Sequence, residues 1–332
     1  MLRQENRDTE RKLMAILTVL RNSAEPVGAR VIAGRLEDLG VQLGERGVRY
    51  HLRLMDERGL TRLVGRRDGR EITEVGVDEL RSALVGDRVG SVTSRIETLA
   101  YFTSLDLDSC SGEVPLNTSL FHKEDYADAL KAMRPVFAAG LCVSDLVLQA
   151  LEADRLAGMT VPPGKAGLST VSSIAIAGVL IRAGVPLHPS FTGLLELRDG
   201  KPHRFTELID CSGCSLDPAE VFIAGRMTSA AAAAATGNGE IVAELWQLPA
   251  ACEPAVERTV ERLKQAGLDG VAVMGRVNTP VCEVSVDPDR VGLVLKHGLN
   301  PVAAAVEAGI EVRNHSMSGV ADWRSLRSFV DF

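Results

Sequence analysis

Arginine and tyrosine side chains that could bind DNA recur at helical spacing near the amino end of the chain. Residues 44–73 read GERGVRYHLRLMDERGLTRLVGRRDGREIT. Long donors of this kind reach guanine edges and phosphate oxygens. We predict DNA contacts from Arg46, Arg49, Tyr50, Arg53, Arg66 and Arg67. Two alternatives stay open, a merely solvated face and a module that serves only as a protein–protein adaptor.

A small helical domain must position these side chains. Apolar spacing, capping residues and glycines predict its elements. The expected elements are a helix capped by Asp8 or Thr9, helices over 27–39 and from Gly44 to Gly59, strands at 60–64 and 70–73, and a helix over 75–84. Val48, Leu52 and Met55 should face its core. This order predicts a winged helix-turn-helix over residues 1–85, a module that commonly binds palindromic operators as a homodimer.

Charge is unevenly distributed along the sequence. The net charge is −7 overall but +4 over residues 44–70, which leaves −11 for the rest. A basic segment on an acidic body suits a protein that contacts double-stranded DNA at one end. No run of about 18 apolar residues predicts a membrane helix, and MLRQENRDTERK lacks the apolar core of a secretory signal. We therefore expect a cytoplasmic protein without a membrane partner, with its six cysteines reduced.

The remainder of the chain, residues 86–332, contains an internal repeat. Residues 112–141 align without gaps on 239–268, and residues 161–187 align on 286–312. The aligned pairs include Gly140 with Gly267, Gly167 with Gly292, and Gly184 with Gly309. We predict an α/β domain of the α+β type, preceded by the winged helix-turn-helix and made of pseudo-repeats at about 110–195 and 237–320. Its expected helices are 123–139, 172–183, 253–266 and 301–308, after a boundary at 86–94.

Motifs for enzyme chemistry are missing from this sequence. It has no Gly-x-Ser-x-Gly elbow, no Walker lysine motif and no strand-linked Gly-x-Gly-x-x-Gly. Cys211 and Cys214 form a C-x-x-C pair that could be half a metal site, joined by His203, a redox pair, or two plain thiols. Further along, Asp217-Pro218 should start a helix that Ser215 could cap, and the alanines at 230–235 predict another short helix.

Several segments together resemble the NrpR family of transcriptional regulators. They are GVRYHLRLMDERGLT in the winged helix, VSSIAIAGVLIRAGVP (171–186), CSLDPAEVFI (214–223) with Met227-Thr228, GRVNTP (275–280), GLNPVAAAVEAGI (298–310) and Met317-Ser318-Gly319. The resemblance implies a dimeric repressor, linked to nitrogen metabolism, that releases its operator when 2-oxoglutarate accumulates. The chain departs from members with two regulatory domains, because it holds one domain that is itself duplicated.

A dicarboxylate effector needs cationic or hydroxyl partners. The candidates nearest the NrpR-like segments are Lys165, Ser172, Ser173, Arg226, Thr228, Arg276 and Asn278. We predict a DNA-binding, ligand-responsive repressor that is not an enzyme and needs no cofactor. Two alternatives remain, a metal- or redox-responsive regulator using Cys211 and Cys214, and a small-molecule enzyme with an appended winged helix.

Overall fold

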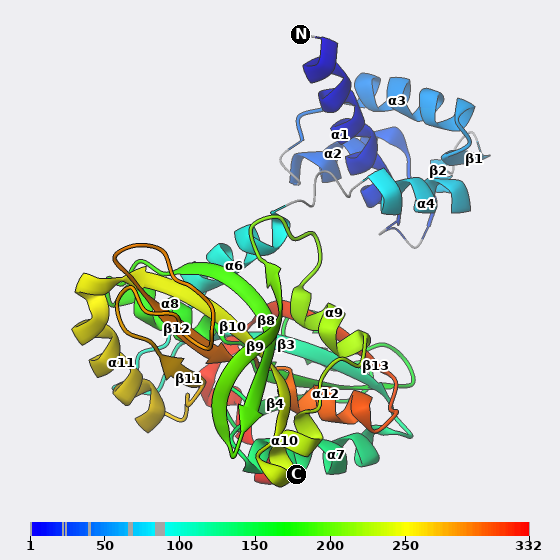
Figure 1. Ribbon diagram of the computed structural model, residues 1–332. Coiled ribbons are helices and arrows are strands. Elements are labelled where there is room, and N and C mark those ends of the chain that lie inside the picture. Colours follow the sequence, from blue (N-terminus) through cyan, green and yellow to red (C-terminus); the bar gives the residue numbers. More distant parts are fainter. Residues whose placement is uncertain are drawn as a thin grey trace. The chain divides into compact units, whose positions relative to one another are not determined.

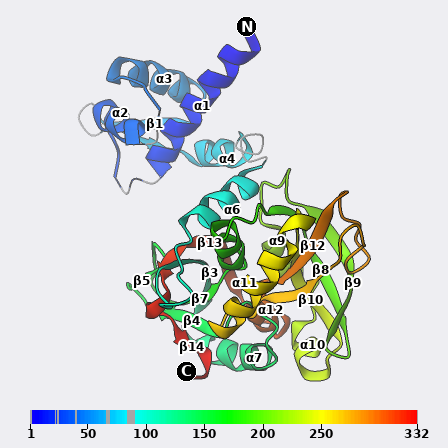
Figure 2. The same cartoon turned by 90° about the vertical axis from the view of Figure 1, so that its left-hand side faces the viewer.

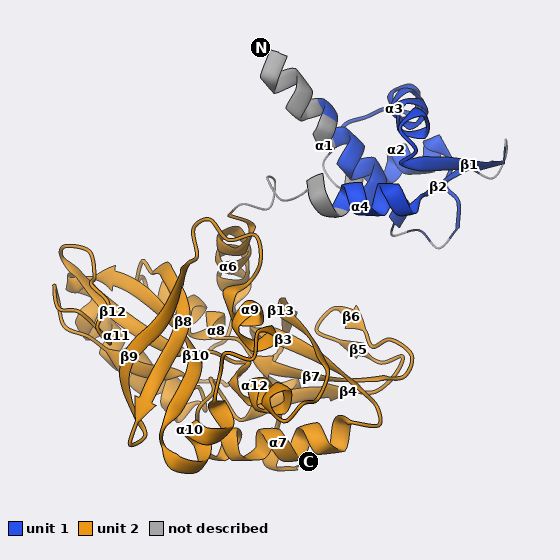
Figure 3. Cartoon of the chain, turned by 45° about the vertical axis from the view of Figure 1, so that its right-hand side comes forward, with its two compact units in different colours: residues 1–88 blue, residues 89–332 orange. Residues whose placement is uncertain are grey.

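The chain forms two compact units, residues 1–88 and 89–332 (Figure 3). The computed structural model describes the backbone of residues 2–21, 23, 25–38, 41–65, 69–83 and 90–331. Each unit has its own core, and each is described by itself below.

The first unit is a winged helix-turn-helix, as predicted (Figure 1). Its elements are α1 (Leu2–Arg21), α2 (Ala29–Asp38), α3 (Glu45–Glu57), β1 (Thr61–Gly65), β2 (Gly69–Ile72) and α4 (Glu74–Ala83). Apolar side chains from all four helices share one core, among them Ile16, Leu17, Ile32, Leu52 and Leu80. Strands β1 and β2 pair antiparallel to form the wing.

Some predicted boundaries in this unit were wrong. Helix α1 begins at Leu2 and not at Asp8 or Thr9, because the residues before Asp8 include strong helix formers. Helix α2 begins only at Ala29. Val27 instead exchanges two backbone hydrogen bonds with Arg70, at 2.8 and 3.0 Å, and so extends the wing sheet.

The second unit holds two five-stranded antiparallel sheets, ordered β11-β12-β10-β8-β9 and β13-β3-β7-β4-β14. Its first elements are α6 (Ser91–Phe102), β3 (Glu113–His122), α7 (Tyr126–Ala138), β4 (Leu146–Ala150), β5 (Arg155–Leu156), β6 (Met159–Thr160), β7 (Lys165–Val171), α8 (Ile174–Arg182), β8 (His188–Arg198) and β9 (Lys201–Asp210). The next are α9 (Pro218–Ala224), α10 (Ala230–Thr236), β10 (Gly239–Pro249), α11 (Glu253–Gln265), β11 (Val271–Met274), β12 (Arg290–Lys296) and α12 (Asn300–Glu307). Last come β13 (Val312–Asp322) and β14 (Arg327–Ser328).

The same order of elements occurs twice in this unit, and the two copies exchange strands. The order β3, α7, β4, β7, α8, β8 recurs as β10, α11, β11, β12, α12, β13. The last strand of the first copy, β8, pairs with β10 of the second, and the last strand of the second, β13, pairs with β3 of the first. Each sheet therefore needs residues from both copies.

The aligned glycines occupy equivalent places. Gly140 and Gly267 follow α7 and α11 with φ of 63° and 87°, a conformation that favours glycine. Gly184 and Gly309 do the same after α8 and α12, with φ of 84° and 89°. Gly167 and Gly292 lie inside β7 and β12, where a Cβ would come within 2.5 Å of a side chain. The glycine register of the repeat thus coincides with that of the structure.

Helices from different copies pack together on either side of the sheets (Figure 2). One core gathers around α7, α12 and α10, and the other around α6, α8 and α11. The alanine run forms α10, which packs against α7, α12 and β10. Both cores draw on strands of both copies.

Other predictions in this unit need correction. Residues 91–94 belong to α6 and not to a boundary. Asp217, not Ser215, caps α9, since its carboxylate accepts the Ala219 N–H at 2.8 Å. Helix α7 begins at Tyr126, because residues 123–125 form a turn. The β8–β9 hairpin and the short strands β5 and β6 were not predicted.

Candidate functional site

Helix α3 has one fully buried face and one exposed face. Val48, Leu52 and Met55 are completely buried, as predicted. Arg46, Arg49 and Arg53 are exposed. The Tyr50 side chain is 56% exposed. The helix is therefore anchored by its apolar side and presents three guanidinium groups and a phenol to solvent.

Exposed carboxylates lie beside two of these arginines. Arg49 contacts Glu45 at 2.5 Å, and Arg53 lies 3.7 Å from Glu57, one helical turn away in each case. Exposed pairs of this spacing contribute only about 0.3–0.5 kcal/mol. A phosphate can therefore replace either carboxylate at small cost.

The wing is pinned close to the helical core. A Cβ at Gly69 would lie 2.4 Å from the Val27 carbonyl carbon, and the residue has a φ of 96°. Arg70 also pairs with Asp56 of α3 at 2.7 Å. Two further predicted DNA-binding residues, Arg66 and Arg67, lie outside the described residues.

The seven candidate effector residues lie at four separate places. Lys165 contacts the His122 imidazole at 2.9 Å on the β3–β7 pair, and Ser172 and Ser173 follow β7. Arg226 and Thr228 lie between α9 and α10, and Arg276 and Asn278 in the loop after β11. The structure therefore does not gather them around one ligand-sized space.

Two of these candidates already bind carboxylates of the protein. Thr228 donates to Glu307 at 2.7 Å, and Glu307 also accepts the N–H groups of Ala230 and Ala231 at the start of α10. Ser173 donates to Glu244 at 2.8 Å. The hydroxyls of Thr228 and Ser173 therefore each donate a hydrogen bond to a carboxylate of the protein itself. Their role in ligand binding stays a prediction.

Glu244 is the centre of a buried polar cluster. It also accepts the Trp246 indole N–H at 2.8 Å and lies 3.5 Å from the imidazole of His297. Burial raises the pKa of Glu244 and lowers the pKa of His297, although each is opposed by the other's charge. Both shifts favour the uncharged forms, which suits a structural cluster between the two copies.

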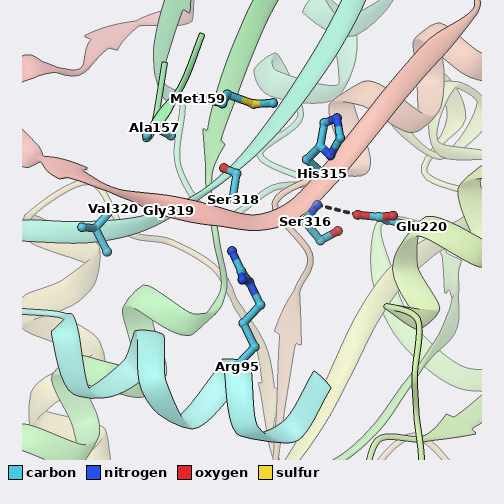
Figure 4. A pocket seen from close by; sticks show the side chains of 10 residues that line it. Arg95, Ala157, Met159, Glu220, His315, Ser316, Ser318, Gly319 and Val320 are labelled. Atoms are coloured by element: carbon cyan, nitrogen blue, oxygen red, sulfur yellow. Dashed lines mark hydrogen bonds between the residues drawn. The ribbon is translucent and has the colours of Figure 1, made fainter. Parts of the chain in front are cut away.

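A cavity of about 510 Å³ lies over β13 (Figure 4). Its lining comes from α6, the β5–β6 hairpin, α9 and β13. The lining residues are Arg95, Ala157, Gly158, Met159, Glu220, His315, Ser316, Ser318, Gly319 and Val320. None of the seven candidate effector residues belongs to the described lining of this cavity.

Strand β13 carries a bulge at this cavity. His315 pairs with Thr118 and Gly319 with Leu116, so three residues of β13 face Asn117 alone on β3. Met317 has a φ of 52°, which is uncommon for a residue with a side chain. Such bulges recur beside functional sites.

Side chains from three elements hold the bulge. The Arg95 guanidinium donates twice to the Met317 carbonyl, and Glu220 accepts the Ser316 N–H (Figure 4). The Asn117 side-chain oxygen accepts the Met317 N–H at 2.9 Å. The bulge of β13 is thus held by Arg95 of α6 and Glu220 of α9, together with Asn117 of β3.

The cysteine pair shows no metal-site geometry. Cys211 is buried, and the Cys214 thiol donates to the Asp210 carbonyl at 2.9 Å. His203 precedes Cys211 by eight residues along β9, or about 26 Å of strand. Within the described ranges, no three His, Cys, Asp or Glu side chains could hold a metal ion together. The described helices also include none that is long and apolar enough to cross a membrane.

Both units of the chain match known protein families. Residues 89–328 match the family described as NrpR regulatory domains NRD1 and 2, and residues 14–80 match the ribonuclease R winged-helix domain. The chain belongs to the NrpR family. It is 36% identical to the global nitrogen regulator NrpRI of Methanosarcina mazei, over 96% of this chain and 98% of that one.

Two other NrpR proteins are longer than this chain. The chain is 33% identical to the global nitrogen regulators NrpR of Methanococcus maripaludis and Methanocaldococcus jannaschii, over 89% and 96% of its length. It spans about half of each of them, 51% and 55%. The fold also resembles a crystal structure of a nitrogen repressor-like protein from Methanococcus jannaschii, with a TM-score of 0.61 and 24% identity over 71% of this chain and 97% of that one.

NrpR membership makes this chain a nitrogen-related transcriptional regulator and not an enzyme. Two of its NrpR-like segments meet at the cavity, since Glu220 belongs to residues 214–223 and the bulge contains Met317-Ser318. Arg95 was missed because residues 86–94 had been interpreted as a boundary. Val92, Ile96 and Leu99 are apolar residues at spacings of four and three, and this helical spacing was the signal for the helix that carries Arg95.

Proposed function

We propose that this chain is a DNA-binding repressor of nitrogen-related genes. It acts in the cytoplasm as a homodimer and releases its operator when 2-oxoglutarate binds the unit of residues 89–332. The observation that carries the DNA-binding part is the exposed cationic face of α3, opposite a completely buried apolar face. Membership in the NrpR family supports the other parts of the proposal, which are the control of nitrogen-related genes, the homodimer and the response to 2-oxoglutarate.

The geometry of α3 suits the major groove. Arg46, Arg49 and Arg53 follow one another at spacings of three and four residues, so they share a side of the helix. Arginine forms bidentate hydrogen bonds with guanine and binds phosphate. The winged helix-turn-helix places such a helix in the groove, and a dimer would read two half-sites about 34 Å apart.

The test of DNA binding uses Arg49→Ala in the full chain. Duplexes enriched by the wild-type protein from a random library serve as probes, titrated by fluorescence anisotropy at several salt concentrations. We expect about 5- to 150-fold weaker binding if Arg49 contacts a base, or a salt slope reduced by about 0.9 if it contacts a phosphate.

Arg58→Ala is the matched control, because Arg58 follows α3 and pairs with Glu79 of α4 at 2.9 Å. It should bind the same duplexes with wild-type affinity. Unchanged affinity and salt slope for alanine variants of Arg46, Arg49 and Arg53 alike would reject α3 as the reading helix.

The inducer is tested separately with the same duplexes. An effector changes DNA affinity only through its different affinities for the bound and free forms of the protein. Saturating 2-oxoglutarate should therefore lower DNA affinity, with glutarate as the control that lacks only the keto group. Sedimentation analysis should give a dimer. Equal DNA affinity with and without 2-oxoglutarate would contradict the inducer, and a monomer would contradict the paired half-sites.

A further inference from the structure

We propose that Glu45 of α3 accepts a hydrogen bond from the amino group of a cytosine, next to a guanine that Arg49 contacts. The two side chains together select part of the operator sequence. The inference rests on the proposed function and deepens it, because it names the bases that this part of α3 recognises. Glu45 was missed from the sequence because only arginine and tyrosine side chains were considered there.

Glu45 and Arg49 lie at the end of α3 that approaches the bases. In a helix-turn-helix protein, the N-terminal residues of the recognition helix contact base edges, and Glu45 is the first residue of α3. Arg49 follows one helical turn later, on the same side of the helix. The Glu45 side chain is 41% exposed and the Arg49 side chain is 70% exposed, so both can reach another molecule.

Gly44, directly before α3, leaves room for DNA at this end of the helix. Its φ of −67° is one that any residue adopts, and a Cβ there would meet no described atom within 4 Å. The fold therefore gives no steric reason for a glycine, and Ser, Asn or Asp would cap the helix better. Glycine is the usual residue where another molecule approaches the backbone closely, which a DNA strand at this position would do.

The two side chains carry opposite hydrogen-bonding groups. Arg49 donates from Nη2 to Oε1 of Glu45. A guanidinium has further N–H donors and a carboxylate has a second oxygen, so each side chain can take a second partner. In the major groove, guanine offers two acceptors that suit arginine, and cytosine offers an amino donor that suits glutamate. The pair therefore matches a cytosine beside a guanine.

The ion pair can open toward DNA at little cost. Exposed pairs at this helical spacing contribute little to stability, whereas hydrogen bonds from charged side chains to base edges discriminate strongly between bases. Arg49 can thus turn to guanine and Glu45 to cytosine without a large loss in the protein.

An acid at this end of α3 also penalises wrong sequences. Duplex DNA carries a dense row of phosphate charges, so the Glu45 carboxylate lowers the affinity for any duplex. A base without a donor leaves the carboxylate desolvated and unpaired, which is unfavourable, whereas a cytosine amino group compensates it. Glu45 therefore increases specificity more than affinity. Its favourable position at the positive end of the helix dipole would stabilise α3 equally on every sequence.

The first experiment compares base preferences by enrichment of duplexes from a random library with the full chain. The wild-type motif should contain a cytosine beside a guanine in each half-site, and Arg49→Ala should lose the preference for that guanine. Glutamine forms bidentate hydrogen bonds with adenine, so Glu45→Gln should prefer adenine in place of the cytosine. A change in helix stability alone cannot produce a new base preference.

Fluorescence anisotropy at a fixed salt concentration measures the same effect as affinities. Replacing that cytosine in the wild-type duplex should weaken wild-type binding about 5- to 150-fold, as for other mismatched base pairs, but should change binding by Glu45→Ala less than about twofold. Glu45→Ala should also bind a random-sequence duplex more tightly than the wild type does, because it lacks a charge that repels phosphates.

Glu57→Gln is the matched control. Glu57 is the last residue of α3 and lies 3.7 Å from Arg53. It is about 18 Å from Glu45 along the helix axis. The substitution removes the same charge as Glu45→Gln at the opposite end of α3, so its enriched motif should equal that of the wild type.

Gly44→Thr tests the close approach of DNA to the first turn. Threonine caps a helix about as well as glycine, so circular dichroism should show an unchanged helix content. DNA binding should weaken, because the added side chain occupies the space that the DNA strand needs.

The possible failures are distinguishable. No enriched motif with the wild-type chain would reject DNA binding, and with it the proposed function. A wild-type motif in Glu45→Gln, or the same change of motif in Glu57→Gln, would overturn cytosine recognition and leave the proposed function standing. Weaker binding of random-sequence duplexes by Glu45→Ala would overturn the charge penalty. Wild-type affinity in Gly44→Thr would overturn the close approach of the first turn.

Discussion

A β-carbon does not fit at Gly298, between β12 and α12. It would lie 2.1 Å from the Val171 carbonyl oxygen and 2.9 Å from the Asn117 side-chain nitrogen. The close approach brings β7 of one copy beside the β12–α12 connection of the other. We predict that Gly298→Ala lowers the free energy of unfolding by about 1–3 kcal/mol, the usual cost of overpacking.

Urea unfolding followed by tryptophan fluorescence measures this effect, because Trp246 and Trp323 both belong to the second unit. Gly213→Ala is the control, since a Cβ there meets no atom within 4 Å. Equal stability of the two variants would show that the contact between the copies relaxes at no cost.

Thiol reactivity should separate the cysteines by burial. Desolvation raises the pKa of Cys142 to about 12 and that of Cys211 to about 12, whereas Cys110 is exposed. The thiolate is the reactive form, and at pH 8 it makes up roughly one part in 10⁴ of a thiol with such a pKa.

We predict that iodoacetamide at pH 8 labels Cys110 in the folded chain and spares Cys142 and Cys211, as read by peptide mass spectrometry. Raising the pH toward 10 should speed the labelling of both buried thiols as their thiolate fraction grows. Fast labelling of Cys211 at pH 8 would revive the redox alternative for the C-x-x-C pair.

Sequence reasoning placed the exposed arginines of α3 better than it placed the residues of the cavity. The exposure of Arg46, Arg49 and Arg53 follows from the helical period, because apolar residues fix the opposite face. Arg95 and Glu220 lie more than a hundred residues apart and meet only through the bulge of β13. Contacts of that kind depend on strand register, which the local sequence pattern does not specify.

At the scale of elements, the cap of α4 offers a direct test. The Thr73 side chain accepts the Gly76 N–H at 3.0 Å and donates to the Gly59 carbonyl at 2.6 Å, so it joins the end of α3 to the start of α4. Thr73→Ala should destabilise the first unit by about 1 kcal/mol.

Thermal unfolding followed by circular dichroism at 222 nm measures this change, and Thr73→Ser keeps the hydroxyl as the control. Loss of the cap should leave the stability of the second unit unaltered, because the two units have separate cores. An alanine variant as stable as the serine variant would refute the role of the cap.

The elements that could be predicted were those with a strong local signal. Helices α7, α8, α11 and α12 show apolar periodicity and end before a glycine with positive φ. The β8–β9 hairpin was missed because its strands lack the regular alternation of a half-buried sheet. Six of the ten residues of β9 are polar, and β9 is an edge strand, where exposed charged residues discourage pairing with other chains.

At the scale of the whole second unit, neither copy should fold without the other. Separating the chain between Ser212 and Gly213, in an exposed loop, leaves β3 without β13 and β10 without β8. We predict that fragments 89–212 and 213–332 are each unfolded or aggregated alone and form a soluble complex when co-expressed.

A tag on one fragment tests whether it retains the other during purification, and far-ultraviolet circular dichroism reports the recovered secondary structure. The uncut fragment 89–332 is the reference. A monomeric, folded fragment 89–212 on its own would contradict the view that the copies complete each other's sheets.

The exchange of β8 and β13 also bears on how such a chain could arise. A gene encoding only one copy would produce a protein whose final strand has no site in its own sheet. Two identical molecules could accommodate each other's final strands, so the primitive product would be a domain-swapped pair. Tandem fusion of that gene would then convert an association that depends on concentration into a single polypeptide, after which the two sequences were free to diverge.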